Sequence, residues 1–197
     1  RGLESYWAVP KQAPTARTGS WKKGPGMDFL HKVKEALPHC YLVAEDLGLI
    51  GDDVRALLEQ SGYPGLAVLQ FAFEPWANSA YLPHNLDKNQ VAYIGTHDND
   101  TALGWLYSAP PEQAAYARDY MQLTVQEGEA WGMLRTLYAS TAHTAIAMAQ
   151  DLLELGSAAR MNIPSQGAGN WGWRMAPGAL TQDIAGRLLH LTRLYGR

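Results

Sequence analysis

The sequence predicts an α/β protein with a parallel sheet, because short apolar segments alternate with amphipathic ones along most of the chain. Two of the apolar segments, residues 41–44 (YLVA) and 90–95 (QVAYIG), run directly into the polar clusters EDLG and THDNDT. Residues that follow the strands of a parallel sheet form the active sites of such folds. We therefore expect adjacent carboxylates to lie at one edge of the sheet.

The other elements follow from apolar periodicity and from residues that start or stop helices. Pro38 and Gly62 lie where two helices should end, and Pro110 and Pro111 lie where a third should begin. The predicted strands are residues 41–44, 66–73, 90–95 and 142–149. The predicted helices are residues 28–37, 51–62, 110–127, 129–140 and 180–191, with long loops at 5–23, 74–88 and 156–178.

The number of strands limits the architecture. Four strands are too few to close a (β/α)8 barrel, which typically takes about 250 residues. With 197 residues, the chain is long enough to bury a core. We expect either an open sheet or half of a barrel, in a single domain that spans residues 1–197.

The composition excludes several classes of protein. A hydrophobic content of 47%, a charged content of 18% and a net charge of -3 fit a globular protein and do not fit a nucleic-acid binder. The single cysteine, Cys40, cannot form an internal disulfide, and no apolar run is long enough to span a membrane. We therefore expect a cytoplasmic protein. The 7 tryptophans and 10 tyrosines slightly favour a carbohydrate site.

Glu45 and Asp98 are the candidate catalytic residues. Glycoside hydrolysis and transfer use carboxylates on both sides of one bond, because the transition state is oxocarbenium-like and positive. The alternative is that these acids only cap helices and form turns, which is the better explanation for one acid but not for two clusters on two strands. His97, Asp98 and Asp100 have the ligand types of a metal site, but no other histidine lies at a suitable spacing, so we expect no metal.

Five segments occur in order over nearly the whole chain: RGLESYWAVP (1–10), AEDLG (44–48), VLQFAF (68–73), THDNDT (96–101) and NWGWR (170–174). Together they resemble the amylomaltases, the 4-alpha-glucanotransferases of glycoside hydrolase family 77. The resemblance implies a (β/α)8 catalytic barrel similar to that of the alpha-amylase clan. This chain would be its C-terminal half, with about four βα units and long active-site loops.

The resemblance also implies roles for the matching residues. Glu45 would be the general acid/base, and Asp98 would stabilise the distorted sugar. The implied substrate-binding residues are Arg1, Gln70, Phe71 on the acceptor side, His97 and Asn162. The family needs no metal and no organic cofactor. Its substrates are malto-oligosaccharides and other α-1,4-glucans, and it passes a glucosyl chain held on an aspartate to the 4-hydroxyl of another glucan with retention.

Two departures from the family pattern stand out. The nucleophilic aspartate of the family lies a few residues before the RGLE segment, where this sequence has none, so we expect the isolated chain to be inactive. Ser165 stands where the family usually has glycine.

Exposed edges of a half-barrel would also promote self-association. A non-catalytic glucan-binding or structural half-barrel and a hydrolase of the alpha-amylase clan remain alternatives.

Overall fold

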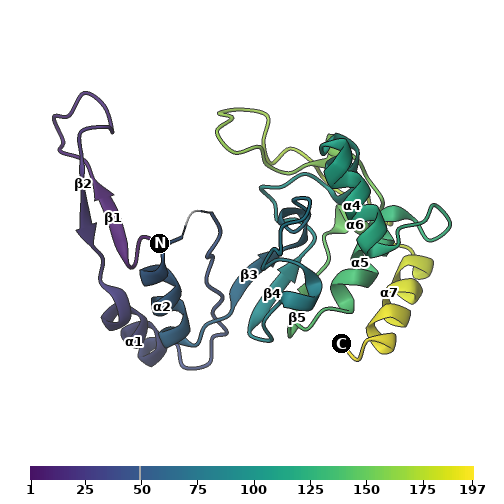
Figure 1. Ribbon diagram of the computed structural model, residues 1–197, viewed down its shortest axis with the longest axis horizontal. Helices are drawn as coiled ribbons and strands as arrows, with labels where there is room; N and C mark the ends of the chain where they lie inside the picture. Colours follow the sequence, from purple (N-terminus) through teal and green to yellow (C-terminus); the bar gives the residue numbers. More distant parts are fainter. Residues whose placement is uncertain (49) are drawn as a thin grey trace. The chain divides into compact units, whose positions relative to one another are not determined.

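A computed structural model describes residues 1–48 and 50–197. The chain divides into two compact units, Arg1–Leu66 and Ala67–Arg197, whose elements are labelled in Figure 1. The boundary falls within a strand, β3 (Gly65–Val68). That residues 1–197 act as one domain stays a prediction.

The first unit begins with an antiparallel hairpin of β1 (Ser5–Ala8) and β2 (Ser20–Lys23), drawn in purple in Figure 1. Trp7 lies opposite Trp21, and their rings meet edge to face with centroids 5.4 Å apart. We predicted a loop over residues 5–23, and the hairpin shows that this prediction is wrong. The four residues of β2 are all exposed, so this hairpin has no buried face that an alternating apolar pattern could reveal.

Two helices follow in the first unit, α1 (Gly26–Ala36) and α2 (Asp52–Ser61), close to their predicted bounds. Gly62 ends α2 in the left-handed conformation, with φ of 69°, which a residue without Cβ adopts at little cost. Neither helix is deeply packed, since α1 has no buried residue and α2 has only Val54.

The strand predicted at residues 41–44 is absent from the described residues, so this prediction is wrong. Ala44 N–H donates to the Pro64 carbonyl at 2.9 Å, just before β3. Tyr41 is 72% exposed and Val43 is 41% exposed. An apolar segment forms a strand only where a neighbouring strand pairs with it over several residues, and that condition cannot be read from the segment alone.

The second unit contains a three-stranded sheet in the order β3, β4 (Gln90–Tyr93), β5 (Thr144–Ile146). β4 and β5 are parallel, with Val91 opposite Thr144. The predicted α/β class with a parallel sheet is therefore confirmed. The predicted strand at 66–73 ends earlier than expected, at Val68, because a 3₁₀ turn (Leu69–Phe71) follows it.

The core of the second unit is organised around α5 (Glu129–Tyr138), which has seven buried residues, among them Trp131 and Leu134. α5 contacts four other helices: α3 (Ala102–Ser108), α4 (Pro111–Met121), α6 (Ala149–Leu152) and α7 (Gln182–Leu194). In Figure 1, α4, α5 and α7 lie on one side of the sheet. Ala67 of β3 and Ala92 of β4 belong to the same hydrophobic core as these helices.

Two helix predictions need correction. The helix expected over residues 110–127 ends at Met121, because Gln122 adopts a left-handed conformation with φ of 51°. The second concerns residues 102–108, for which the sequence predicted no element and where the chain forms α3. Thr101 caps α3 by accepting a hydrogen bond from Gly104 N–H, which provides a start signal of the Ser/Thr type.

Candidate active site

The THDNDT loop follows β4 and is held by its own side chains. The Asn99 Oδ1 accepts hydrogen bonds from both the backbone N–H and the hydroxyl of Thr96, each at 2.9 Å. Asn99 N–H donates back to the Thr96 carbonyl at 3.1 Å. Asparagine and threonine side chains commonly stabilise turns in this way. The loop is thus a closed turn that presents His97 and Asp98 on its outside.

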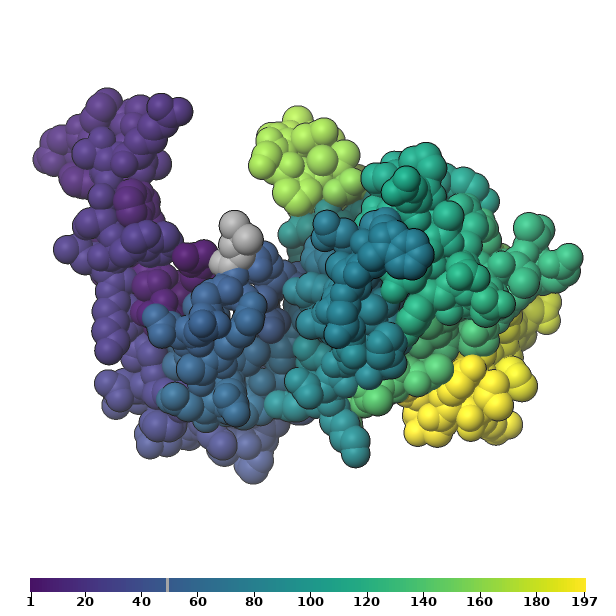
Figure 2. Space-filling model, in the orientation of Figure 1, coloured from purple at the N-terminus to yellow at the C-terminus, as the bar shows by residue number. Residues whose placement is uncertain are grey.

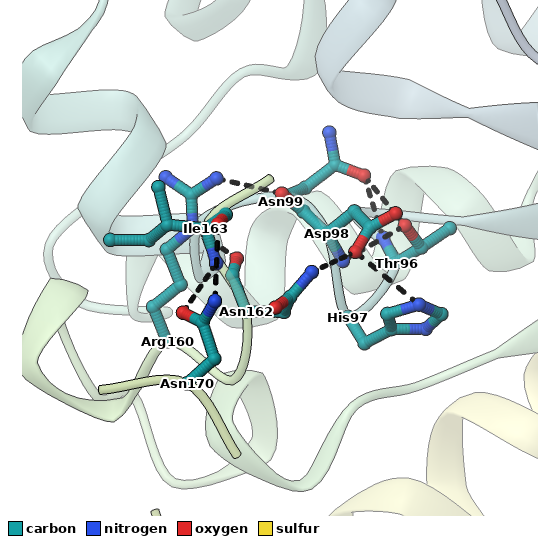
Figure 3. Close-up of polar contacts among 8 residues, drawn as sticks. All are labelled: Thr96, His97, Asp98, Asn99, Arg160, Asn162, Ile163 and Asn170. Carbon is teal, nitrogen blue, oxygen red and sulfur yellow. Dashed lines mark hydrogen bonds and ion pairs between the residues drawn. The ribbon is translucent and has the colours of Figure 1, made fainter. Parts of the chain in front are cut away.

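Asp98 has two side-chain partners in this loop region, drawn in Figure 3. The Asn162 Nδ2 donates to the Asp98 Oδ1 at 2.5 Å. The His97 Nε2 lies 3.4 Å from the same oxygen. The Asp98 side chain is 46% exposed and that of His97 is 49% exposed. Asp98 is therefore a carboxylate of fixed orientation that a ligand can still reach.

Arg160 joins two segments that are far apart in the sequence. Its Nη2 donates to the Asp98 carbonyl at 2.7 Å, and its Nε donates to the Asn162 carbonyl at 2.8 Å. Asn162 N–H donates to the His97 carbonyl at 3.1 Å. These bonds attach the segment around Asn162 to the THDNDT loop, and the rigid fork of a guanidinium suits two acceptors at once. No sequence pattern assigns a role to Arg160, because its partner Asp98 lies 62 residues away.

Gln70 and Phe71 lie in the 3₁₀ turn that follows β3. Gln70 is 4% exposed, and its Nε2 donates to the Asp100 carbonyl at 2.8 Å. A Cβ at Gly95 would lie 2.7 Å from this same Nε2, so a larger residue there would displace the Gln70 amide. Phe71 is 45% exposed and meets Tyr81 edge to face, with centroids 5.8 Å apart. Gln70 thus stabilises the THDNDT loop through a buried hydrogen bond, whereas the ring of Phe71 is accessible.

Asp151 is a buried carboxylate beside the loop, two residues beyond the strand predicted over 142–149. It is 4% exposed, and its Oδ1 accepts a hydrogen bond from Ala102 N–H, in the first turn of α3, at 2.7 Å. Burial raises the pKa of Asp151 to about 6; the Ala102 hydrogen bond lowers it, and the charge of Asp100 raises it further. A cavity of about 10 Å³, enough for one water, lies between Asp151, Asp100 and Arg160.

The segment after Asn162 forms a loop that ends at Trp171. Asn170 donates from Nδ2 to the carbonyls of Ile163 and Gln166, at 3.2 and 3.0 Å, and accepts from Ile163 N–H at 2.9 Å. The Trp171 ring lies 5.1 Å from the His97 ring, centroid to centroid. Ser165, where the family usually has glycine, adopts a left-handed conformation with φ of 69°. Trp171, which lies in the NWGWR segment, is therefore a neighbour of the site, a contact that the sequence did not predict.

Glu45 and Arg1 belong to the first unit. Glu45 is exposed, and its neighbour Asp46 accepts a hydrogen bond from Leu66 N–H at 2.7 Å. The guanidinium of Arg1 lies over the Trp21 ring, 4.8 Å from its centroid. That Glu45 and Asp98 share one cleft stays a prediction.

Two further properties concern the described residues as a whole. In this part of the chain, no group of three or more His, Cys, Asp or Glu side chains is arranged to hold a metal ion. The helices found in the same part are too short or too polar to cross a membrane.

Comparison with known proteins places these features in a family. A family model described as 4-alpha-glucanotransferase matches residues 1–181. The 4-alpha-glucanotransferase of Clostridium butyricum is 42% identical over 100% of this chain and 41% of its own length. That of Streptococcus pneumoniae is 46% identical over 100% and 39%, and the chloroplastic/amyloplastic DPE1 of Arabidopsis thaliana is 42% identical over 100% and 35%. The chain thus spans about two-fifths of the length of these relatives.

Solved structures agree with this comparison. The amylomaltase from Streptococcus agalactiae in complex with acarbose matches with a TM-score of 0.92 and 38% identity, over 100% of this chain and 40% of that chain. The amylomaltase from Corynebacterium glutamicum, at 16% identity and a TM-score of 0.70, covers 97% of this chain and 34% of its own and shares the fold. These findings define an α/β protein of amylomaltase-like fold with an accessible carboxylate after a parallel strand. The chain belongs to the 4-alpha-glucanotransferase family, glycoside hydrolase family 77.

Proposed function

We propose that this chain forms part of a 4-alpha-glucanotransferase that moves α-1,4-glucan segments to the 4-hydroxyl of another glucan or of glucose. The observation that carries the proposal is the half-exposed carboxylate of Asp98, held by Asn162 and His97 in a chain of this family. A glucosyl oxocarbenium ion is positive, so a fixed carboxylate beside it lowers the barrier. Asp98 therefore stabilises the distorted sugar in the transition state.

The remaining roles follow the family pattern. Glu45 acts as general acid/base: it protonates the leaving oxygen and then removes the proton from the acceptor hydroxyl. The family pattern also assigns Arg1, Gln70, Phe71, His97 and Asn162 to sugar binding. Because Gln70 is buried and bonded to the Asp100 carbonyl, its contribution is to position the loop. The nucleophile of this retaining reaction is not assigned to any residue of this chain.

The proposal also covers the architecture of the enzyme, its substrates, its cellular location and its self-association. The sheet of the second unit would be part of a (β/α)8 barrel, with its long loops at the carboxyl ends of the strands. The substrates would be malto-oligosaccharides and other α-1,4-glucans, a proposal supported by the acarbose complex of the Streptococcus agalactiae amylomaltase. The cytoplasm is the proposed location, supported by the single cysteine. Exposed sheet edges would favour self-association.

The test is product analysis on maltotriose, using protein expressed from the complete coding sequence. Transfer gives glucose together with a ladder of longer glucans, whereas a hydrolase gives only shorter sugars. A protein that binds maltoheptaose but changes neither sugar would be a non-catalytic glucan binder. Asp98→Asn should abolish the ladder while retaining the fold, and Asp87→Asn, in an exposed loop before β4, serves as the matched control.

A further inference from the structure

The loop from Ile163 to Trp171 is closed by one side chain. Asn170 makes three hydrogen bonds across it, to the backbone of Ile163 on both its N–H and its carbonyl and to the carbonyl of Gln166. Trp171 N–H donates to the Met161 carbonyl at 2.7 Å, which fixes the far end of the loop. In Figure 2 this yellow-green loop stands out from the surface of the second unit. A loop closed in this way presents the residue that follows Asn170 in a defined place.

Trp171 is held in a conformation that bulky residues avoid. Its φ is 60°, in the left-handed region, where a bulky side chain is a genuine outlier. Such conformations are strained and persist where the surroundings over-determine them, which occurs often at binding sites. Here the Met161 hydrogen bond and the Asn170 closure provide that restraint.

The strain does not serve to bury the indole. Trp171 remains 60% exposed, whereas Trp131 in the core is 2% exposed. The contact of Trp171 is with His97, at 5.1 Å between centroids and 39° between planes. His97 in turn lies 3.4 Å from the Asp98 carboxylate. One side of the indole is thus placed against the candidate site, and a large apolar surface is left open next to polar groups.

This combination suits a sugar. A pyranose ring has apolar C–H faces and polar hydroxyls around its edge, so it binds where an aromatic face adjoins hydrogen-bonding groups. Asp98, Asn162 and His97 supply those groups within the same loop cluster. We propose that Trp171 is a stacking platform for a glucosyl ring of an α-1,4-glucan, held in place by Asn170. This inference rests on the proposed function and adds a specific binding residue to it.

Kinetics on maltotriose test the platform. Trp171→Ala should raise KM about tenfold, equivalent to about 1.4 kcal/mol, with kcat nearly unchanged, because the lost stacking is made in both the bound substrate and the transition state. Trp171→Phe keeps a flat ring and should restore most of the affinity. Asn170→Ala should also raise KM, because it releases the loop without removing the indole. Trp76→Phe is the control, since Trp76 is 97% exposed and lies outside this loop.

A direct readout comes from fluorescence. Maltoheptaose should protect an indole of the wild-type protein from acrylamide quenching, and the protection should be missing in Trp171→Phe but present in Trp76→Phe. If Trp171→Ala instead lowers kcat at unchanged KM, the indole only orients His97 and the platform is overturned. The platform would also be overturned if maltoheptaose protected the Trp171→Phe protein from quenching as strongly as it protects the wild type. A different result would overturn the proposed function itself: a wild-type protein that makes no glucan ladder from maltotriose.

Discussion

The Asn162 amide donates to the Asp98 carboxylate at 2.5 Å across 64 residues of sequence. The backbone N–H of Asn162 also donates to the His97 carbonyl, so one residue holds both the side chain and the main chain of the THDNDT loop. A hydrogen bond to a charged group is worth about 1.5–3 kcal/mol. Asn162 therefore sets the orientation of the carboxylate that we propose to stabilise the transition state.

The first prediction concerns this amide. Asn162→Ala should lower kcat/KM on maltotriose about tenfold to a hundredfold, the equivalent of losing one such bond, because the Asp98 Oδ1 then loses its amide donor. Asn162→Asp should be worse at neutral pH, since a second carboxylate would face the first. The measurement is a pH profile of kcat/KM, with Asn78→Ala as a control in an exposed loop. An unchanged rate for Asn162→Ala would remove this residue from the site.

The second prediction concerns Arg160, which joins the Asp98 and Asn162 carbonyls. Arg160→Lys retains the charge but has no planar fork, so it cannot satisfy both acceptors with the same geometry. Both Arg160→Lys and Arg160→Ala should therefore reduce kcat/KM, with a smaller loss for lysine. Circular dichroism would check that the fold persists. Full activity in Arg160→Lys would show that charge alone, rather than the bridging geometry, matters here.

The parts of this site that were predictable from the sequence are the local ones. The strand at 90–95 and the acids after it share one short segment, so the pattern alone singled out Asp98 as a candidate catalytic residue, whereas the role of His97 came from the family resemblance. The contacts of Arg160 and Trp171 with that segment join positions far apart in the chain, and nothing in the local pattern encodes them. The strand expected at 41–44 failed for the same reason, because strand formation depends on a distant partner.

The burial of Asp151 was also not predictable from the sequence. Asp151 comes two residues after the strand predicted over 142–149, yet the chain turns into α6 there and buries its carboxylate at the start of α3. An acid in a sequence is exposed by default. Only the packing of α3 and α6 around it reveals that Asp151 is inside.

The third prediction uses this burial. Burial raises the pKa of Asp151 to about 6 in the folded protein from an ordinary value of 3.8. The folded state therefore prefers the neutral acid, so the stability from this group is fully present below pH 3.8 and is lost as the pH rises through about 6. The size of the loss is at most about 3 kcal/mol, at 1.36 kcal/mol for each pKa unit.

Asp151→Asn should remove that pH dependence, because an amide oxygen can still accept the Ala102 hydrogen bond but carries no charge. At pH 8 the variant should be more stable than the wild type, and near pH 4 the two should be similar. Urea unfolding at both pH values measures the difference, and Asp183→Asn, on the exposed first turn of α7, is the control. A variant that loses more stability at pH 8 than at pH 4 would contradict the prediction, because the ionised carboxylate would then be the stabilising form.

The last prediction concerns Glu45 in the enzyme expressed from its complete coding sequence. General acid/base catalysis typically contributes about 10²–10⁴-fold to the rate. Glu45→Gln keeps the size of the side chain but cannot donate or accept the proton, so the rate on maltotriose should fall by that order. Glu59→Gln, on the exposed surface of α2, should leave the rate unchanged.

The leaving group separates the acid role from a structural one. Fluoride departs with little protonation, so maltosyl fluoride should restore the first half-reaction in Glu45→Gln, visible as rapid fluoride release in a single turnover. The second half-reaction should stay slow with a sugar acceptor, since the same residue must remove the proton from the acceptor hydroxyl. A small anionic acceptor such as azide needs no such base and should restore turnover. If fluoride release is as slow as cleavage of maltotriose, Glu45 is not the general acid.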